Sequence, residues 1–420
     1  MGDAEAVGRL SSDITIQLVW GARWEEALEI ARRGLVALGE RVSVDRCRLL
    51  GCAGVTLSMA GYHTAAEGMI AQAVTIAEQL GDERPLGNAL RYKTGHHWAY
   101  MEFREVVDTG LRAAELMRSS GDLWQVASVL WYIQHALLLL GRLDEAATIS
   151  QELEPLATRL GHLGALLQTR RGLGVREFML AGDLDKYEEF ARGDLDLCRS
   201  LATPFISISY TFLGLADFWR GRWQEGLESF QEAVRLAPPG LWAGGDWAFL
   251  FLGKAYARAG GAARARREEG GDNLPRPGHP NTLGAWTMLF AVVEGLAVLA
   301  EREEAAKLYP SVVEATDTGC LICWADARLL QSVAGMAAAA GGQWEKAEEH
   351  YETALRQAHE LPIVTEQPEV RRWYARMLID RDGPGDREKA RELLTEAIAM
   401  YRRIGMPKHV EMAEALLGEL

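Results

Sequence analysis

The stretch YTFLGLADFWRGRWQEGLESFQEAVRLAP, residues 210–238, decides the fold. Two runs of helix-forming residues flank the short turn sequence RGR. Gly214 lies in the middle of the first run, and the small residue Gly226 follows twelve positions later in the second. Phe230 comes next, and Pro238 ends the second run because proline cannot continue a helix. The stretch predicts two antiparallel helices that approach closely at Gly214, with Phe230 packed in the groove between them.

The same pattern recurs about every forty residues, which is long enough for two helices and two short connections. Turn-like positions fall at Gly21, Gly61, Glu102, Gly141, Gly182, Gly221, Gly260, Glu301 and Gly342. Mid-helix glycines recur in phase at Gly54, Gly95, Gly174, Gly214, Gly253, Gly295 and Gly335. Small residues follow several of them at the same twelve-residue spacing, and each is expected to meet the glycine across the pair, as in Gly54 and Ala66, Gly95 and Val107, Gly253 and Ala265, and Gly335 and Ala347. A mid-helix glycine costs up to about 1 kcal/mol relative to alanine, so its regular use indicates close helix packing.

These repeats predict an all-α fold in which about nine to ten antiparallel helix pairs stack into a right-handed superhelical solenoid. Trp24, Trp223 and Trp344 are expected to open second helices just after the turns. The whole chain, 1–420, is expected to form a single solenoid. An irregular insertion loop is predicted at 270–283, after a short basic helix around Arg264, Arg266 and Arg267, and a C-terminal capping helix at 406–420.

The repeat resembles the tetratricopeptide pattern, with an aromatic residue, Leu-Gly, Ala-x3-Phe and then Pro. The forty-residue step, and stretches such as WEKAEEHY at 344–351 and EVRRWYAR at 369–376, resemble the C-terminal repeat arrays of maltose-regulator-type activators and ATPase-linked adenylate cyclases of bacteria. The resemblance implies a sensor or interaction module. It carries over no catalytic residue, because the sequence contains no Gly-x4-Gly-Lys-Ser/Thr phosphate loop.

Composition narrows the class of protein. Hydrophobic residues make up 48% and charged residues 25% of the chain, which is typical of a folded protein. A net charge of −14 argues against a nucleic-acid partner. The sequence shows no signal peptide or apolar run long enough to span a membrane, and its five cysteines are sparse, so we expect a reduced, cytoplasmic protein that does not bind membranes.

The first helix of each pair is expected to line the concave surface. Positions three before and one after each mid-helix glycine lie on one helical face and should point into the groove. With residues one turn away included, this predicts binding residues at Tyr92, His96, Trp131, His135, Gln168, Arg171, Trp247, Lys254, Arg372 and Arg376.

An aromatic residue four positions before a histidine, in two successive pairs, is the sharpest local feature. Tyr92, His96, Trp131, His135 and Arg171 could form one patch that binds a flat or apolar molecule with an anionic group. The alternative is that the same residues pack between repeats, with buried polar tips.

Two motifs invite a chemical interpretation. Cys320-Leu-Ile-Cys323 has redox or zinc spacing and is expected to open a helix, but the chain offers no second cysteine pair and no strand–helix context. Buried packing of both thiols is therefore the favoured interpretation. His96 and His97 point about 100° apart on a helix and cannot clamp one ion. No cofactor and no metal are predicted.

The favoured function is a non-catalytic binding module, with a protein or peptide as the default partner and a small effector as the rival. An enzyme that uses His96 and His135 on a small molecule is the alternative, and nucleic-acid binding is the weakest candidate. The oligomeric state is left open.

Overall fold

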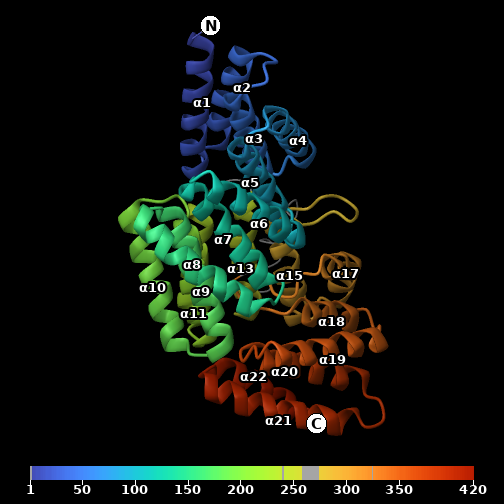
Figure 1. The fold of residues 1–420 in the computed structure, drawn as a ribbon. Helices are drawn as coiled ribbons and strands as arrows, with labels where there is room; N and C mark the ends of the chain where they lie inside the picture. Colours follow the sequence, from blue (N-terminus) through green and yellow to red (C-terminus); the bar gives the residue numbers. More distant parts are fainter. Residues whose placement is uncertain (1, 239–240, 258–273, 324) are drawn as a thin grey trace. The chain divides into compact units, whose positions relative to one another are not determined.

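The computed structural model describes residues 2–238, 241–257, 274–323 and 325–420, which form helices joined by short connections (Figure 1). Outside helices, the described residues contain an isolated β-bridge between Ile322 and Leu329. Internal contacts divide the chain into two compact units. Unit 1 comprises Met1–Leu173, Pro238–Leu241 and Pro280–Leu283, and unit 2 comprises Gly174–Ala237, Trp242–His279 and Gly284–Leu420. A single solenoid over 1–420 stays a prediction.

The helices of unit 1 are α1 (Gly2–Trp20), α2 (Trp24–Leu38), α3 (Val44–Met59), α4 (His63–Leu80), α5 (Glu83–Ala99), α6 (Phe103–Ser119), α7 (Leu123–Leu139) and α8 (Leu143–Leu160). Helix α9 (Leu163–Ala181) passes from unit 1 into unit 2. Unit 2 continues with α10 (Leu184–Leu201), α11 (Ile206–Trp219), α12 (Trp223–Leu236), α13 (Leu241–Tyr256), α15 (Leu283–Val298), α16 (Arg302–Lys307), α17 (Tyr309–Asp317), α18 (Leu330–Ala340), α19 (Trp344–Glu360), α20 (Glu366–Arg381), α21 (Asp386–Ile404) and α22 (Pro407–Leu417). Consecutive helices pack as pairs, which confirms the all-α repeat.

The predicted turns separate the helices of each pair. Gly221 has a φ of +79°, the left-handed conformation that glycine adopts without steric cost. Two predicted turns have Glu102 and Glu301 in place of glycine. In these turns the residue with left-handed backbone conformation is one position earlier, at Met101 and Ala300. As expected, the three tryptophans predicted to open second helices are the first residues of α2, α12 and α19.

The mid-helix glycines permit close packing, as predicted, but the principal contact differs. A Cβ on Gly214 would overlap the Phe230 ring, and one on Gly335 would lie 2.8 Å from the Tyr351 ring. The large side chain sixteen positions later therefore fills the space at the glycine. The small residue at the twelve-residue spacing also matters, because a Cβ on Gly226 would lie 3.0 Å from the Gly214 carbonyl oxygen.

Gly95 has a different environment from Gly214. A Cβ there would lie 3.1 Å from Val55 of α3 and 3.2 Å from the Tyr132 hydroxyl of α7. Its space is therefore taken by neighbouring first helices rather than by the expected Val107 of its own pair. The predicted partner of Gly253, Ala265, lies outside the described residues, as do the basic helix around Arg264 and the turn at position 260.

Unit 1 has its most buried helix in α7, where every residue from Val126 to Leu139 is buried. A helix that is buried all round needs neighbours on every side, and α5, α6 and α8 pack against it. The unit also contains a contact between distant helices. The Trp20 ring at the end of α1 lies 2.7 Å from where a Cβ on Gly164 of α9 would be.

In unit 2, segments near the C-terminal end of the chain contact the segment at the start of the unit. The Val364 amide donates to the Met179 carbonyl at 2.8 Å, and a Cβ on Gly182 would lie 3.2 Å from the Ile404 side chain. In a simple solenoid each repeat contacts only its neighbours. These contacts join segments about 200 residues apart, and the repeat pattern did not predict them.

The predicted capping segment contains α22, which packs on α21 and reaches α11. Of the predicted insertion loop, residues 270–273 lie outside the described part, residues 274–282 are irregular and α15 begins at Leu283. Within the described part of the chain, no helix combines the length and apolar character that crossing a membrane requires.

Candidate functional site

Tyr92 and His96 lie on α5 and are each 4% exposed. The Tyr92 hydroxyl is 2.8 Å from the Cys52 sulfur, and His96 Nδ1 is 2.9 Å from the Ser58 hydroxyl. Both partners belong to α3, so these two side chains tie adjacent first helices together. Burial, followed by the neighbouring imidazole of His63, lowers the pKa of His96 to about 4.

Trp131 and His135 repeat this arrangement on α7, where each is 6% exposed. The Trp98 Nε1–H donates to His135 Nδ1 at 2.8 Å, and the Trp98 and Trp131 rings meet edge to face at 5.2 Å. Burial lowers the pKa of His135 to about 3, so its imidazole is neutral at pH 7. These contacts correspond to the inter-repeat packing that the sequence analysis left open as the alternative.

The remaining predicted residues separate into three environments. Arg171 on α9 is fully buried, whereas Gln168 of the same helix is half-buried. Trp247 and Lys254 on α13 are also half-buried. The last two predicted residues, Arg372 and Arg376, line a cavity in unit 2.

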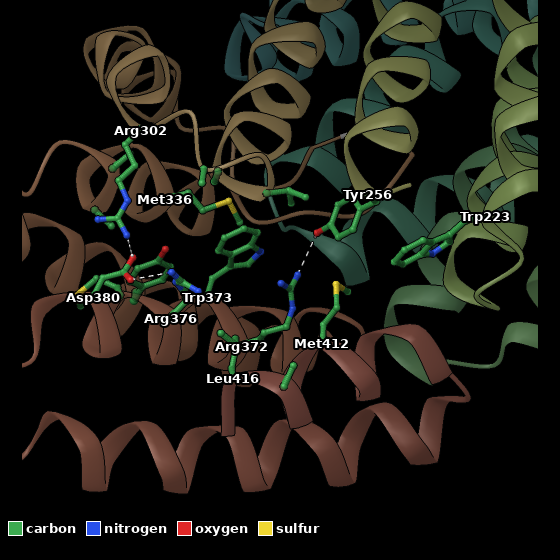
Figure 2. A pocket seen from close by; sticks show the side chains of 18 residues that line it. Trp223, Tyr256, Arg302, Met336, Arg372, Trp373, Arg376, Asp380, Met412 and Leu416 are labelled. Atoms are coloured by element: carbon green, nitrogen blue, oxygen red, sulfur yellow. Dashed lines mark hydrogen bonds and ion pairs between the residues drawn. The ribbon is translucent and has the colours of Figure 1, made fainter. Parts of the chain in front are cut away.

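This cavity has a volume of about 310 Å³, and α20 and α22 form two of its walls (Figure 2). We call it the α20–α22 cavity. Most of its lining is apolar, and the polar groups gather along α20. Its lining residues are Trp223, Tyr256, Ala297, Val298, Ala300, Arg302, Met336, Ala339, Ala340, Tyr351, Arg372, Trp373, Arg376, Met377, Asp380, Met412, Ala415 and Leu416. The volume lies at the lower end of the range for small-molecule sites.

Two guanidinium groups meet one carboxylate at the edge of the cavity. Arg302 Nη2 lies 2.8 Å from Asp380, and Arg376 Nη2 lies 3.0 Å from the same carboxylate (Figure 2). Asp380 and Arg376 are four residues apart on one face of α20, while Arg302 comes from α16. Arg376 also approaches Glu419 at 3.8 Å, which is too long for a hydrogen bond. The Arg302 and Arg376 side chains are 49% and 39% exposed, so both remain accessible to a ligand.

Arg372 is fixed in the cavity wall by partners on three helices. It donates to Glu369 at 2.8 Å on its own helix, to the Tyr401 hydroxyl at 3.1 Å on α21 and to the Tyr256 hydroxyl at 3.1 Å on α13. Its charge is balanced by Glu369. Burial alone would raise the pKa of Glu369, but Arg372 and Arg328 hold it well below its usual range.

The indole of Trp373 stands among the lining side chains, with the Arg372 guanidinium 4.7 Å from its ring centre (Figure 2). Only 7% of Trp373 is exposed. Among the described residues, its Nε1–H has no hydrogen-bond acceptor. A buried donor without an acceptor costs about 1–3 kcal/mol, so this N–H is a place where a bound acceptor would contribute affinity.

A buried charge network reaches the cavity wall through Glu369, the partner of Arg372, and the repeat pattern does not predict it. Arg328 donates to Glu294 at 2.8 Å, to Glu366 at 2.8 Å and to Glu369 at 2.9 Å. Burial raises the pKa of Glu366 to about 8, although the Arg328 guanidinium opposes this shift. One signal was available, because Glu294 is the lone charged residue in the otherwise apolar sequence of α15.

The cysteine motif does not open a helix, which corrects that expectation. Cys320 and Cys323 lie in the irregular segment between α17 and α18, and α18 begins only at Leu330. The thiols therefore lack the helix dipole that would favour a thiolate. Both side chains are buried, and burial raises the pKa of Cys320 to about 12.

No protein-family model matches the chain, and no curated protein matches its sequence. Solved structures are similar to it at low identity, including the following three. One is a Rap protein complexed with competence and sporulation factor, with a TM-score of 0.46, 11% identity and coverage of 99% of this chain and 97% of that one. The second is yeast Tom70, with a TM-score of 0.39, 12% identity and coverage of 97% and 88%. The third is a signal-transduction ATPase with numerous domains and a tetratricopeptide-repeat sensor from Pyrococcus horikoshii, with a TM-score of 0.36, 13% identity and coverage of 93% and 55%.

Proposed function

We propose that this chain is a non-catalytic binding module, and that the α20–α22 cavity of unit 2 is where it holds a ligand. The observation that carries this proposal is the cavity itself, about 310 Å³ of largely apolar space with guanidinium groups at its edge. An apolar pocket with a few convergent polar groups is typical of a ligand site.

The polar groups of the cavity suit binding better than catalysis. The guanidiniums of Arg302, Arg372 and Arg376 act only as hydrogen-bond donors. Asp380 is held between two of them. Burial raises the pKa of the Tyr256 hydroxyl well above its usual value, so it remains protonated. Such groups orient a ligand through hydrogen bonds and charge, which is what a binding site requires.

The alternative function is an enzyme that uses His96 and His135. It would require both imidazoles to converge on one substrate. The hydrogen-bond partners of these imidazoles are Ser58 and Trp98, on two different helices, and both histidines are almost fully buried. This geometry favours the binding module over the enzyme.

A protein partner is a second candidate, favoured by one exposed surface of unit 1. Leu123, Trp124 and Leu163, which we call the tryptophan patch, are 38%, 46% and 48% exposed. The Trp124 ring stacks on His162, with centroids 4.2 Å apart. Tryptophan is enriched at protein–protein contacts, and contiguous exposed apolar side chains mark such contacts. We propose a bacterial signalling or transcription-regulatory role in the cytoplasm, in which the cavity senses a small effector and the patch binds a protein or peptide.

The cavity can be tested by filling it. Ala339 lines it and is half-buried, so Ala339→Phe should occupy part of the space. Ala399→Phe, at an exposed position of α21 outside the cavity, is the matched control. Each protein is incubated with a small-molecule extract, separated by gel filtration and analysed by mass spectrometry. A compound retained by the wild type and by Ala399→Phe but lost by Ala339→Phe supports the proposal. Retention by all three proteins, or by none, contradicts it.

A further inference from the structure

The edge of the α20–α22 cavity has more donors than nearby acceptors. Arg302 and Arg376 each carry five N–H donors, and both pair with the single carboxylate of Asp380. Glu419 approaches Arg376 only at 3.8 Å and is 48% exposed, so this pair is weak. An incoming carboxylate could therefore form charge-assisted hydrogen bonds with guanidinium N–H groups that remain accessible.

Behind these guanidiniums the cavity is apolar and adaptable. Met336, Met377 and Met412, from α18, α20 and α22, line the cavity, and the Trp373 indole lies beside Met336 (Figure 2). Methionine side chains adapt to irregular shapes and contact aromatic rings favourably. The body of a ligand should therefore be apolar, and an aromatic ring would fit this lining well.

The buried guanidinium of Arg372 is not available to pair with a ligand carboxylate. Arg372 is 4% exposed, and its N–H groups are directed to Glu369, Tyr256 and Tyr401. Its charge is already balanced inside the protein. The charge that a ligand meets is therefore set by Arg302, Arg376 and Asp380 at the edge.

We infer that the α20–α22 cavity binds a small carboxylic acid with an apolar body, whose carboxylate lies at Arg302 and Arg376 and whose body lies against Trp373 and the methionines. This inference rests on the proposed function, since it names the ligand class of the same cavity. A free acid and the C-terminus of a peptide share this chemistry. We favour the free acid, because the volume of about 310 Å³ suits a small molecule.

The test uses matched series of compounds that differ only in the polar group, such as 4-phenylbutanoate, 4-phenylbutanamide and 4-phenylbutylamine. Series with other aromatic and aliphatic bodies are included, and the affinity of each compound for the full chain is measured by calorimetry. We expect the acids to bind about tenfold more tightly than the amides with the same body, and the amines to bind most weakly. An N-acetylated tetrapeptide with a free C-terminal phenylalanine distinguishes the two sources. Weaker binding than by the free acids supports a free acid, and tighter binding overturns that assignment in favour of a peptide end.

Two substitutions at the edge of the cavity are expected to change the affinity for acids in opposite directions. Arg376→Gln should weaken binding of the acids about tenfold, because it removes one guanidinium. Asp380→Asn should strengthen it several-fold, because it frees both guanidiniums from their carboxylate while keeping its shape. A cationic ligand would reverse both effects. Both side chains lie at the edge of the cavity rather than in the buried network, so the variants should fold.

The outcomes separate this inference from the proposed function. Preferential binding of acids, lost in Ala339→Phe and shifted as described by the two edge substitutions, supports the inference. Amides or amines that bind as tightly as acids, with binding lost in Ala339→Phe, overturn the ligand class and leave the binding cavity standing. If no compound depends on Ala339, both proposals fail.

Discussion

In both units, the first helix of a helix pair carries side chains at equivalent repeat positions, but these side chains have different surroundings in the two units. In unit 1, His96 and His135 are neutral, and each shares a hydrogen bond with a neighbouring first helix. In unit 2, Arg372 and Arg376 are charged; one is fixed in a buried network and the other lies at the edge of a cavity. The repeat position therefore selects a helix face, while the side chains that cover that face decide whether it packs against a neighbouring helix or lines a cavity.

The largest expected effect is the loss of stability when the buried charge network around Arg328 in unit 2 is broken. Arg328→Met leaves the buried side chains of Glu294, Glu366 and Glu369 without their shared guanidinium, and should reduce the free energy of unfolding by about 3–5 kcal/mol. Urea unfolding followed by circular dichroism measures the change. Arg33→Met, in an exposed pair with Glu29, is the control and should change the free energy of unfolding far less, because water and salt screen an exposed ion pair. Equal effects of the two substitutions would contradict the structural role of the network.

The next effect concerns close packing within a helix pair. Gly214→Ala should destabilise unit 2 by about 1–3 kcal/mol, because the added Cβ would overlap the Phe230 ring. Gly193→Ala, at a helical position of α10 with open space around it, should stabilise the protein by about 0.5–1 kcal/mol. The two variants are compared by thermal unfolding. If both shift the midpoint in the same direction, the glycine does not serve helix approach.

A smaller effect is expected in unit 1. His135→Leu removes the acceptor of the Trp98 N–H and should cost about 1–2 kcal/mol of stability. Gln at the same position can restore an acceptor and should recover part of the loss. Because His135 does not line the α20–α22 cavity, neither variant should change ligand affinity there by more than about twofold. Calorimetry with a compound that binds in that cavity checks this. Loss of its binding in either variant would make His135 a candidate binding residue again.

The last expected effect is a gradual change of stability with pH, with a slope of at most about 1.4 kcal/mol per pH unit. Burial raises the pKa of Glu366 from 4.5 to about 8. The folded protein therefore holds a proton that the unfolded chain releases above pH 4.5, and this contribution is lost as pH rises towards 8. Glu366→Gln removes it, so stability of the variant relative to the wild type should increase between pH 5 and 8. Parallel stability curves for the two proteins would show that Glu366 does not titrate in this range.

The sequence predicted local features of the fold well, because a repeat is encoded locally. The turn at Gly221, the helix start at Trp223 and the groove position of Phe230 all follow from spacing within one pair. The contact between Met179 and Val364 could not be predicted in this way. It depends on the small rotation of each helix pair relative to the next, added over many repeats. A local sequence pattern does not determine this total rotation.

The candidate site was predicted only in part. Arg372 and Arg376 were identified from their position on a first helix, and both line the cavity. Arg302 and Trp373 were missed, because the former comes from a different helix and the latter lies outside the two positions considered. Periodicity identifies a helix face, but convergence of several helices on one space requires their arrangement.

Hydrogen–deuterium exchange, with and without a small molecule that the protein retains, tests the central claim most directly. If unit 2 binds the ligand in the α20–α22 cavity, protection should increase in α20, α22 and the C-terminal end of α18, while exchange in α5 and α7 stays unchanged. Increased protection in α5 and α7, with none in α20 and α22, would contradict the account and place the site at the aromatic and histidine residues of unit 1.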